Sequence, residues 1–338
     1  MTFNLLALAL AGIAGASFAL PMRYFRGWRW EHVWIGQALT SNLAFPLLTL
    51  ALLWGQFRMH LTEFPVAREA VILALGVAWG MGGIGYGLSL VLLGLSFTYS
   101  IIFSVTTIFG ALLPMWIGLR GRPEHLIWFA LGLGLCVAGI IVIASAAARR
   151  EKETSSRAGT LETLAVPVPP LPYKASLLLT VAAGFFSAAM GLALVVNEDL
   201  VNHLVTHGVS PAFAPLIVWV PLGVGSATAS LIFGFWCAWR ASSARSFLDS
   251  HPGRNWLLVT LMGVLGFGVL LLYGWGSTAR GHPPKNVSWA VYMTVYILAG
   301  NAIGLLTREW KNCSRATYAE LTAGIALLLG AIVSLAMA

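Results

Sequence analysis

The chain has 338 residues, of which 58% are hydrophobic and only 9% are charged. Because a soluble domain carries roughly 25% charged residues, this composition excludes an ordinary water-soluble fold and indicates an integral membrane protein. The formal net charge of +8 does not indicate a nucleic-acid partner, since the Lys and Arg residues stand between apolar runs, where they would meet anionic lipid head groups.

Ten apolar runs follow one another along the chain, and each is long enough for a helix that crosses a bilayer. None shows the period-two alternation of a membrane β-barrel, so the expected fold class is an all-α integral membrane protein with ten transmembrane helices. The first run is expected to be a retained span and not a signal peptide, because its basic residues follow it. The runs cover residues 3–22, 33–54, 70–92, 97–119, 126–147, 176–196, 211–239, 256–276, 288–307 and 317–337.

Residues 149–175 are charged and then proline-rich, and they cannot cross a membrane. We expect them to form a cytoplasmic linker between a first five-helix repeat (1–148) and a second five-helix repeat (176–338). Because five is odd, the two repeats must be inverted relative to each other, as in many secondary transporters. Lys and Arg are concentrated in the odd-numbered loops, which the positive-inside rule makes cytoplasmic, so both termini are expected in the periplasm.

Residues 76–87 read GVAWGMGGIGYG, and positions 80–85 fit the dinucleotide-binding pattern G-x-G-x-x-G. That pattern binds a cofactor only between a strand and a helix, with an acid about 20 residues further on. Here it stands inside an uncharged apolar run, so we expect no cofactor. Two interpretations stay open. The glycines allow close helix packing, or they also leave room beside a substrate path that Trp79 and Tyr86 line.

The polar residues within the predicted spans are uncharged. Neutral hydrogen-bonding groups combined with aromatic faces suit a neutral polyhydroxy solute, because sugar rings stack their C–H faces on Trp and Tyr. The alternative is that the same residues make hydrogen bonds between helices or form interfacial aromatic belts. The candidate substrate-binding residues are Trp79, Tyr86, Tyr99, Asn42, Tyr273 and Asn301.

All twelve acidic residues are expected in loops or near the ends of spans. Glu320, Asp199 and His203 are the candidates for proton coupling. Because Asp199, His203 and His207 are spaced i, i+4 and i+8, they would share one helix face, where they could hold a metal, carry a proton or lie on a solvated helix end. We expect no metal there. The chain also has no G-x-S-x-G or H-E-x-x-H sequence, so we expect no enzyme.

Several short motifs are scattered from one end of the chain to the other. They are Pro21-Met22-Arg23, Gly27-Trp28-Arg29-Trp30-Glu31, Trp79-Gly80-Met81-Gly82, Tyr86-Gly87-Leu88, Leu93-Gly94-Leu95-Ser96, Phe186-Ser187-Ala188, Gly208-Val209-Ser210-Pro211, Ser288-Trp289 and Glu309-Trp310. Together they resemble the bacterial L-rhamnose/proton symporters of the drug/metabolite transporter superfamily. The chain departs from that family's pattern at Gly83 and Gly85, where the family has asparagines, and at Lys285-Asn286, where an acid would be expected.

The resemblance implies ten helices, an inner-membrane location and import of a deoxysugar together with a proton. We therefore expect a secondary transporter that takes up L-rhamnose or a related sugar by alternating access, with spans three, four, eight and nine lining a midplane cavity. Two alternatives stay open. One is export of amino acids or other small metabolites, as relatives in the superfamily do, and the other is a metal-dependent membrane enzyme.

Overall fold

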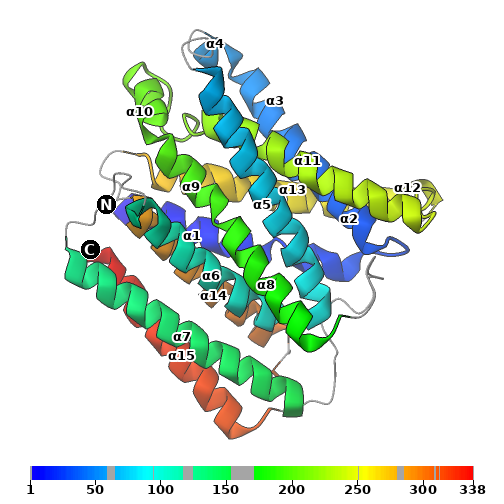
Figure 1. Cartoon of the computed structure of the whole chain (residues 1–338), viewed down its shortest axis with the longest axis vertical. Helices are drawn as coiled ribbons and strands as arrows, with labels where there is room; N and C mark the ends of the chain where they lie inside the picture. The colour runs from blue at the N-terminus through cyan, green and yellow to red at the C-terminus, as the bar shows by residue number, and fades with distance from the viewer. Residues whose placement is uncertain are drawn as a thin grey trace.

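The computed structural model describes residues 2–58, 65–93, 95–116, 125–153, 171–249, 251–279, 285–307, 310–311 and 313–337. Every regular element in those ranges is helical (Figure 1). The elements of the first half are α1 (Thr2–Ser17), the 3-10 helix η1 (Leu20–Tyr24), α2 (Trp30–Gln37), the π-helix η2 (Ala38–Ala44), α3 (Phe45–Leu52), α4 (Trp54–Phe57), α5 (Val66–Leu93), α6 (Leu95–Trp116) and α7 (Leu126–Glu153). Those of the second half are α8 (Tyr173–Ser187), α9 (Ala189–Val196), α10 (Glu198–Thr206), α11 (Leu216–Arg240), α12 (Ser246–Asp249), α13 (Pro252–Gly276), α14 (Lys285–Leu306) and α15 (Arg315–Ala336).

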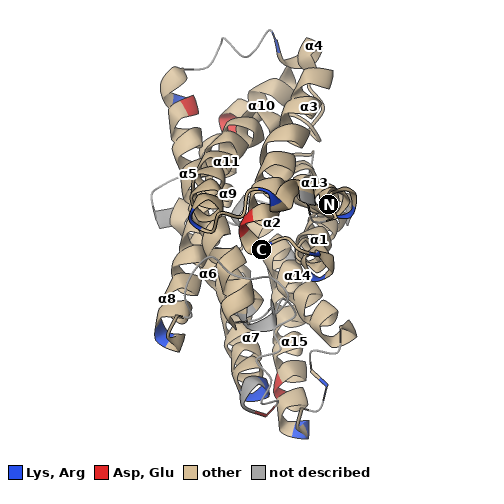
Figure 2. Ribbon diagram, turned by 90° about the vertical axis from the view of Figure 1, so that its right-hand side faces the viewer, with Lys and Arg blue, Asp and Glu red and all other residues tan. Residues whose placement is uncertain are grey.

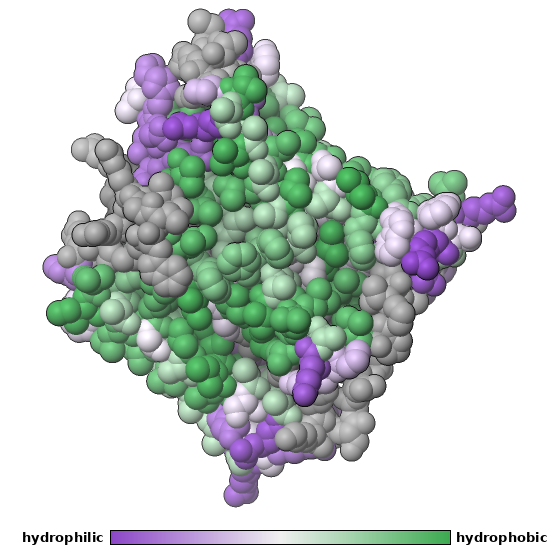
Figure 3. Space-filling view, viewed as in Figure 1, coloured by the Kyte–Doolittle hydropathy of each residue, from purple (hydrophilic) through white to green (hydrophobic). Residues whose placement is uncertain are grey.

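Nine helical segments within the described ranges are long and apolar enough to cross a membrane. A shorter apolar stretch, Ile101–Pro114 in α6, lies where the fourth span is predicted. Apolar residues cover the middle of the visible surface and hydrophilic residues gather at its corners (Figure 3). Charged residues lie mostly toward the ends of helices (Figure 2). The all-α membrane fold is therefore confirmed, and the count of ten helices stays a prediction.

The helices of the two predicted repeats pack in matching pairs. α1 packs against α13 and α14, as α8 packs against α5 and α6. The contact of α5 with α11 likewise matches the contact of α13 with η2. α7 packs along α15, its counterpart in the second predicted repeat (Figure 1). This exchange of partners is what an inverted repeat predicts, and the repeat itself stays a prediction.

The linker predicted for residues 149–175 is described only at its two ends. α7 continues to Glu153, so the first linker residues are helical, and α8 begins at Tyr173. Residues 154–170 lie outside the described ranges. The division of the chain into two units joined by this linker therefore stays a prediction.

α5 and α11 approach each other backbone to backbone. A Cβ on Gly80 would come within 2.8 Å of the Ser226 Cα, and a Cβ on Gly76 would come within 3.0 Å of the Leu222 Cα. Only glycine allows so close an approach at these positions. Membrane helices use small residues in this way because close contact between backbones replaces the hydrophobic driving force that lipid does not supply.

The second predicted span is not one continuous α-helix. α2 passes into the π-helix η2, where the Phe45 N–H bonds to the Thr40 carbonyl, five residues earlier. Pro46 explains the change, because it has no N–H to donate to the carbonyl of Asn42. π-helical turns occur mostly at functional sites. This one brings Asn42 into the buried interior.

α7 and α15 are fastened to each other near the C-terminal end of α7. The Glu153 carboxylate accepts hydrogen bonds from the Ser314 N–H at 2.8 Å and from the Ser314 and Thr317 hydroxyls at 2.6 and 2.9 Å. The hydrogen bonds from Ser314 lower the pKa of Glu153 below its usual value. They also place its negative charge at the N-terminus of α15, where the helix dipole favours it. Arg149 of α7 pairs with Glu320 of α15 at 2.6 Å.

Candidate functional site

A cavity lies at the centre of the helical assembly, and its described lining comes from every long helix except α7 and α15. Its volume is about 140 Å³, which leaves room for on the order of ten water molecules at roughly 10–15 Å³ each. No charged side chain is among the described residues that line it. Its neutral polar residues include Gln37, Ser41, Asn42, Thr106, Ser226 and Ser230.

The polar residues of the cavity join the two halves of the chain. The Asn42 amide donates a hydrogen bond to the Ser226 hydroxyl at 3.0 Å, which connects η2 to α11. The Thr106 hydroxyl donates to the Gly184 carbonyl at 2.8 Å, which connects α6 to α8. Each of these side chains has more donor or acceptor positions than the one bond uses. The remaining positions can serve the hydroxyl groups of a solute.

Aromatic rings form much of the remaining wall. The Tyr86 hydroxyl donates to the Tyr99 hydroxyl at 3.2 Å, and Tyr99 donates to the Ala16 carbonyl at 2.9 Å. Tyr99 therefore positions Tyr86 from behind the wall. Such rings present an apolar face and a polar edge, a combination that matches a sugar ring. The lining aromatic residues include Trp34, Trp79, Tyr86, Trp289, Tyr292 and Tyr296.

The glycine-rich stretch of α5 meets a different environment at each glycine. Gly80 packs against the α11 backbone, as described above, and Gly85 packs against Ala183 of α8, where a Cβ would come within 2.7 Å of the alanine methyl. Gly83 lines the cavity, and a Cβ there would meet only the Trp34 ring, at 3.8 Å. The stretch therefore packs closely at Gly80 and lines the cavity at Gly83, and a substrate path beside it stays a prediction.

Comparison with known proteins extends over the whole chain. A family model described as L-rhamnose-proton symport protein (RhaT) matches residues 2–338. The chain belongs to this family. A relative from Cronobacter sakazakii is 28% identical over 352 residues, which cover 100% of this chain and 98% of that protein. A relative from Salmonella paratyphi B is 28% identical over 343 residues, which cover 97% and 96%. A solved crystal structure, 15% identical, shares the fold at a TM-score of 0.54 over 99% of this chain and 96% of its own.

In this RhaT-family chain, the cavity brings together three of the predicted substrate-binding residues, Trp79, Tyr86 and Asn42. The four helices α5, α6, α13 and α14 line it, as predicted for spans three, four, eight and nine, but α1, α2, η2, α8, α9 and α11 contribute as well. The side chains of Lys285 and Asn286 lie outside what the structure describes.

The other three predicted substrate-binding residues are buried but do not line the cavity. Tyr99 stands behind Tyr86. Tyr273 packs edge-on against the Trp289 ring, with centroids 5.5 Å apart, so it supports a lining residue. The Asn301 amide donates to the Ile297 carbonyl of its own helix at 2.9 Å. A direct role in binding stays a prediction for these three.

The three predicted proton-coupling residues do not line the cavity. Glu320 belongs to the ion pair between α7 and α15. The Asp199 side chain is 66% exposed and pairs with Arg68 at 2.8 Å. Partial burial raises the pKa of Asp199, but the hydrogen bond and charge of Arg68 outweigh that effect and lower it overall. The His203 ring faces the His207 ring at 4.1 Å. Within the described ranges, no three His, Cys, Asp or Glu side chains are grouped to hold a metal.

Trp34 and Ser226 line the cavity but belong to none of the sequence motifs, and Glu31 stands out in the sequence only as the last residue of the Gly27–Glu31 motif. Trp34 stacks on Trp30 with centroids 5.1 Å apart, and their spacing of four residues indicates a shared helix face. Ser226 and Ser230 have the same spacing on α11 and both line the cavity. Glu31 lies near the end of its helix, as predicted for the acids, yet it is fully buried.

Proposed function

We propose that the chain imports L-rhamnose or a closely related deoxysugar together with a proton, by alternating access. The observation that carries the proposal is the central cavity. Its described lining is uncharged, its polar groups lie among aromatic faces, and its volume of about 140 Å³ suits a monosaccharide. A charged solute would find no counter-charge there, and an unpaired buried ion costs several kcal/mol.

Family membership supports the same substrate class. The relatives from Cronobacter sakazakii and Salmonella paratyphi B are named L-rhamnose-proton symporters, and the similarity extends over nearly all of each chain. Export of amino acids is the less favoured alternative, because an amino acid carries two charges that the cavity does not match.

The mechanism follows from the way the two halves meet. Two inverted five-helix repeats, 1–148 and 176–338, rock around the cavity that they share, and the linker of 149–175 joins them on the cytoplasmic side. Both termini face the periplasm of a bacterial inner membrane. Each inward-moving proton gains about 2.3 kcal/mol per 100 mV of membrane potential, and that gain drives sugar accumulation.

Uptake into vesicles tests the proposal. Full-length protein reconstituted into proteoliposomes should accumulate labelled L-rhamnose when the outside is made acidic, and a protonophore should abolish the accumulation while exchange of rhamnose for rhamnose continues. Unlabelled rhamnose should compete with the label. Accumulation that survives the protonophore would reject proton coupling, and the absence of both uptake and exchange would reject the substrate. Competition by amino acids alone would support the exporter.

A further inference from the structure

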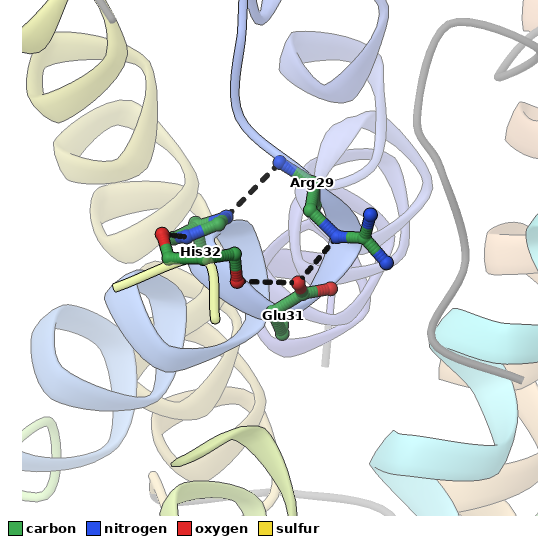
Figure 4. A network of polar contacts seen from close by, with 4 residues as sticks. Arg29, Glu31 and His32 are labelled. Carbon is green, nitrogen blue, oxygen red and sulfur yellow. Dashed lines mark hydrogen bonds and ion pairs between the residues drawn. The ribbon is translucent and has the colours of Figure 1, made fainter. Parts of the chain in front are cut away.

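Glu31 is a buried acid one helical turn before Trp34 of the cavity wall, and the transport mechanism proposed above does not use it. Its side chain is 0% exposed. Its Oε1 accepts hydrogen bonds from Arg29 Nε at 2.6 Å and from the Ser243 hydroxyl at 2.9 Å (Figure 4). Its Oε2 is also buried and has no hydrogen-bond partner among the residues that the structure describes. One carboxylate oxygen is therefore held by two donors, and the other has none.

His32, the next residue, makes a hydrogen bond through each of its ring nitrogens. Its Nδ1 accepts a hydrogen bond from the Arg29 backbone N–H at 3.0 Å, so this nitrogen carries no proton. Its Nε2 then carries the proton and donates to the Ser243 carbonyl at 2.8 Å. His32 thus fixes the geometry, and Glu31 is the group with a free position for a proton.

Within the described ranges, the ionisable groups near Glu31 belong to its own segment and to α11. Arg29 is the ion-pair partner, and Cys237 of α11 lies near enough to interact with Glu31, Arg29 and Arg240. Among the described residues, the ionisable groups near Glu31 are Arg29 and His32 beside it in the chain and Cys237 on α11, which Arg240 also approaches. Toward α12 and α13, the segment from Arg26 to Gly36 contacts four side chains that carry no ionisable group, Phe247, Asn255, Trp256 and Val259.

Glu31 lies one helical turn from the cavity. Trp34, three residues further along α2, lines the cavity and stacks on Trp30. On the facing helix α11, Ser230 lines the cavity, and Gly234, one turn further on, packs directly against α2. The contact between α2 and α11 therefore connects Glu31 to the cavity wall.

We infer that Glu31 is the proton-binding residue of the transport cycle, an inference that rests on the proposed proton symport. The proton adds to Oε2 and converts the carboxylate to a neutral carboxylic acid, with no other bond made or broken except hydrogen bonds. Arg29 and Ser243 donate hydrogen bonds to Oε1, and the buried Oε2, which has no donor among the described residues, is the oxygen to which the proton can add.

Proton binding at this position also acts on the contact between the two halves of the chain. Ser243 belongs to the second half, and α2 belongs to the first. Loading the proton removes the negative charge that holds Arg29 and weakens the hydrogen bond from the Ser243 hydroxyl, because a charged acceptor binds a donor more strongly than a neutral one. The halves become freer to move relative to each other when the proton is bound.

Glu31→Gln tests the inference in proteoliposomes, with Glu69→Gln, the same change at an exposed acid of α5, as the matched control. With one proton per sugar, a gradient of one pH unit supports roughly tenfold accumulation of rhamnose, since one pH unit corresponds to a factor of ten. Wild type and Glu69→Gln should reach that level. Glu31→Gln should not concentrate rhamnose at all, yet it should still exchange internal for external rhamnose. Tenfold accumulation by Glu31→Gln would overturn the inference.

A second measurement needs no sugar and separates this inference from the proposed function. Infrared difference spectra of purified protein between neutral and acidic pH should show the carbonyl stretch of a buried carboxylic acid in wild type and not in Glu31→Gln. If Glu31→Gln does not fold, Ser243→Ala replaces it. Ser243→Ala removes a hydrogen-bond donor to the ionised Glu31 carboxylate. The pH at which the carboxylic-acid band reaches half of its full intensity should therefore be higher than in wild type. Absence of the band from wild type, or an unmoved midpoint in Ser243→Ala, would overturn the inference. If the band behaves as expected but rhamnose is not transported, only the proposed function fails.

Discussion

Replacing Gly83 with alanine separates the cavity from the helix packing of α5. A Cβ at Gly83 would meet only the Trp34 ring, at the ordinary contact distance of 3.8 Å. Alanine stabilises a helix relative to glycine by roughly 0.5–1 kcal/mol, so Gly83→Ala should be at least as stable as wild type. Its methyl group occupies cavity space, however, and a misfit of one methyl-sized group costs about 1–3 kcal/mol of binding, or roughly 10- to 200-fold. Rhamnose affinity should fall by that order.

Gly80→Ala is the matched control, because the same methyl group at this position would come within 2.8 Å of the Ser226 Cα. Such overpacking costs typically about 1–3 kcal/mol, more than alanine gains in helix propensity. Tryptophan fluorescence during heating in detergent measures stability, and calorimetric titration with rhamnose measures affinity. Wild-type affinity in Gly83→Ala would refute the assignment of the cavity as the sugar site. Wild-type stability in Gly80→Ala would refute the packing argument.

Three further substitutions address other parts of the molecule. The folded-state pKa of Glu153 lies below its unfolded value, so its contribution to stability is present above the unfolded pKa and is lost as the pH falls through the folded pKa. The melting temperature of wild type should therefore exceed that of Glu153→Gln at neutral pH and converge with it in acid, and a constant difference would contradict this. Gly223→Ala should lower both stability, by about 1–3 kcal/mol, and rhamnose uptake, because its Cβ would collide with the Asn42 carbonyl in η2; wild-type values for both would contradict it. Trp79→Ala should raise the KM for uptake with little change in melting temperature, because Trp79 lines the cavity and is only half-buried; an unchanged KM would remove Trp79 from the site.

The membrane fold and part of the cavity can be predicted from the sequence because both depend on local composition. Trp79, Tyr86 and Asn42 stand out as hydrogen-bonding residues within apolar runs, where such groups are scarce. Tyr99 and Tyr273 meet the same criterion but stand behind the cavity wall. In a helix that is buried on most sides, hydrophobic periodicity does not reveal which face turns toward the cavity.

The remaining features depend on contacts between distant parts of the chain. Glu31 is buried because the segment around Ser243, more than 200 residues further along, covers it. The arginine two residues before Glu31 is a local hint of pairing, but it does not reveal burial. Likewise, the position of Gly83 beside an open space, and of Gly80 against a backbone, is decided by where α11 crosses α5.

The π-helix η2 determines which residues of the second span share a face. Asn42 stands eight residues after Trp34. In a continuous α-helix, the two side chains would therefore point in directions about 80° apart. Both residues nevertheless line the same cavity, because the wider turns of η2 take up part of that rotation. Deleting one residue between Asn42 and Phe45 would restore a regular α-helix through this segment and leave Asn42 about 80° away from the direction of Trp34. The length of this segment, as well as its side chains, therefore shapes the cavity, and insertions or deletions here would act as strongly as substitutions in the wall.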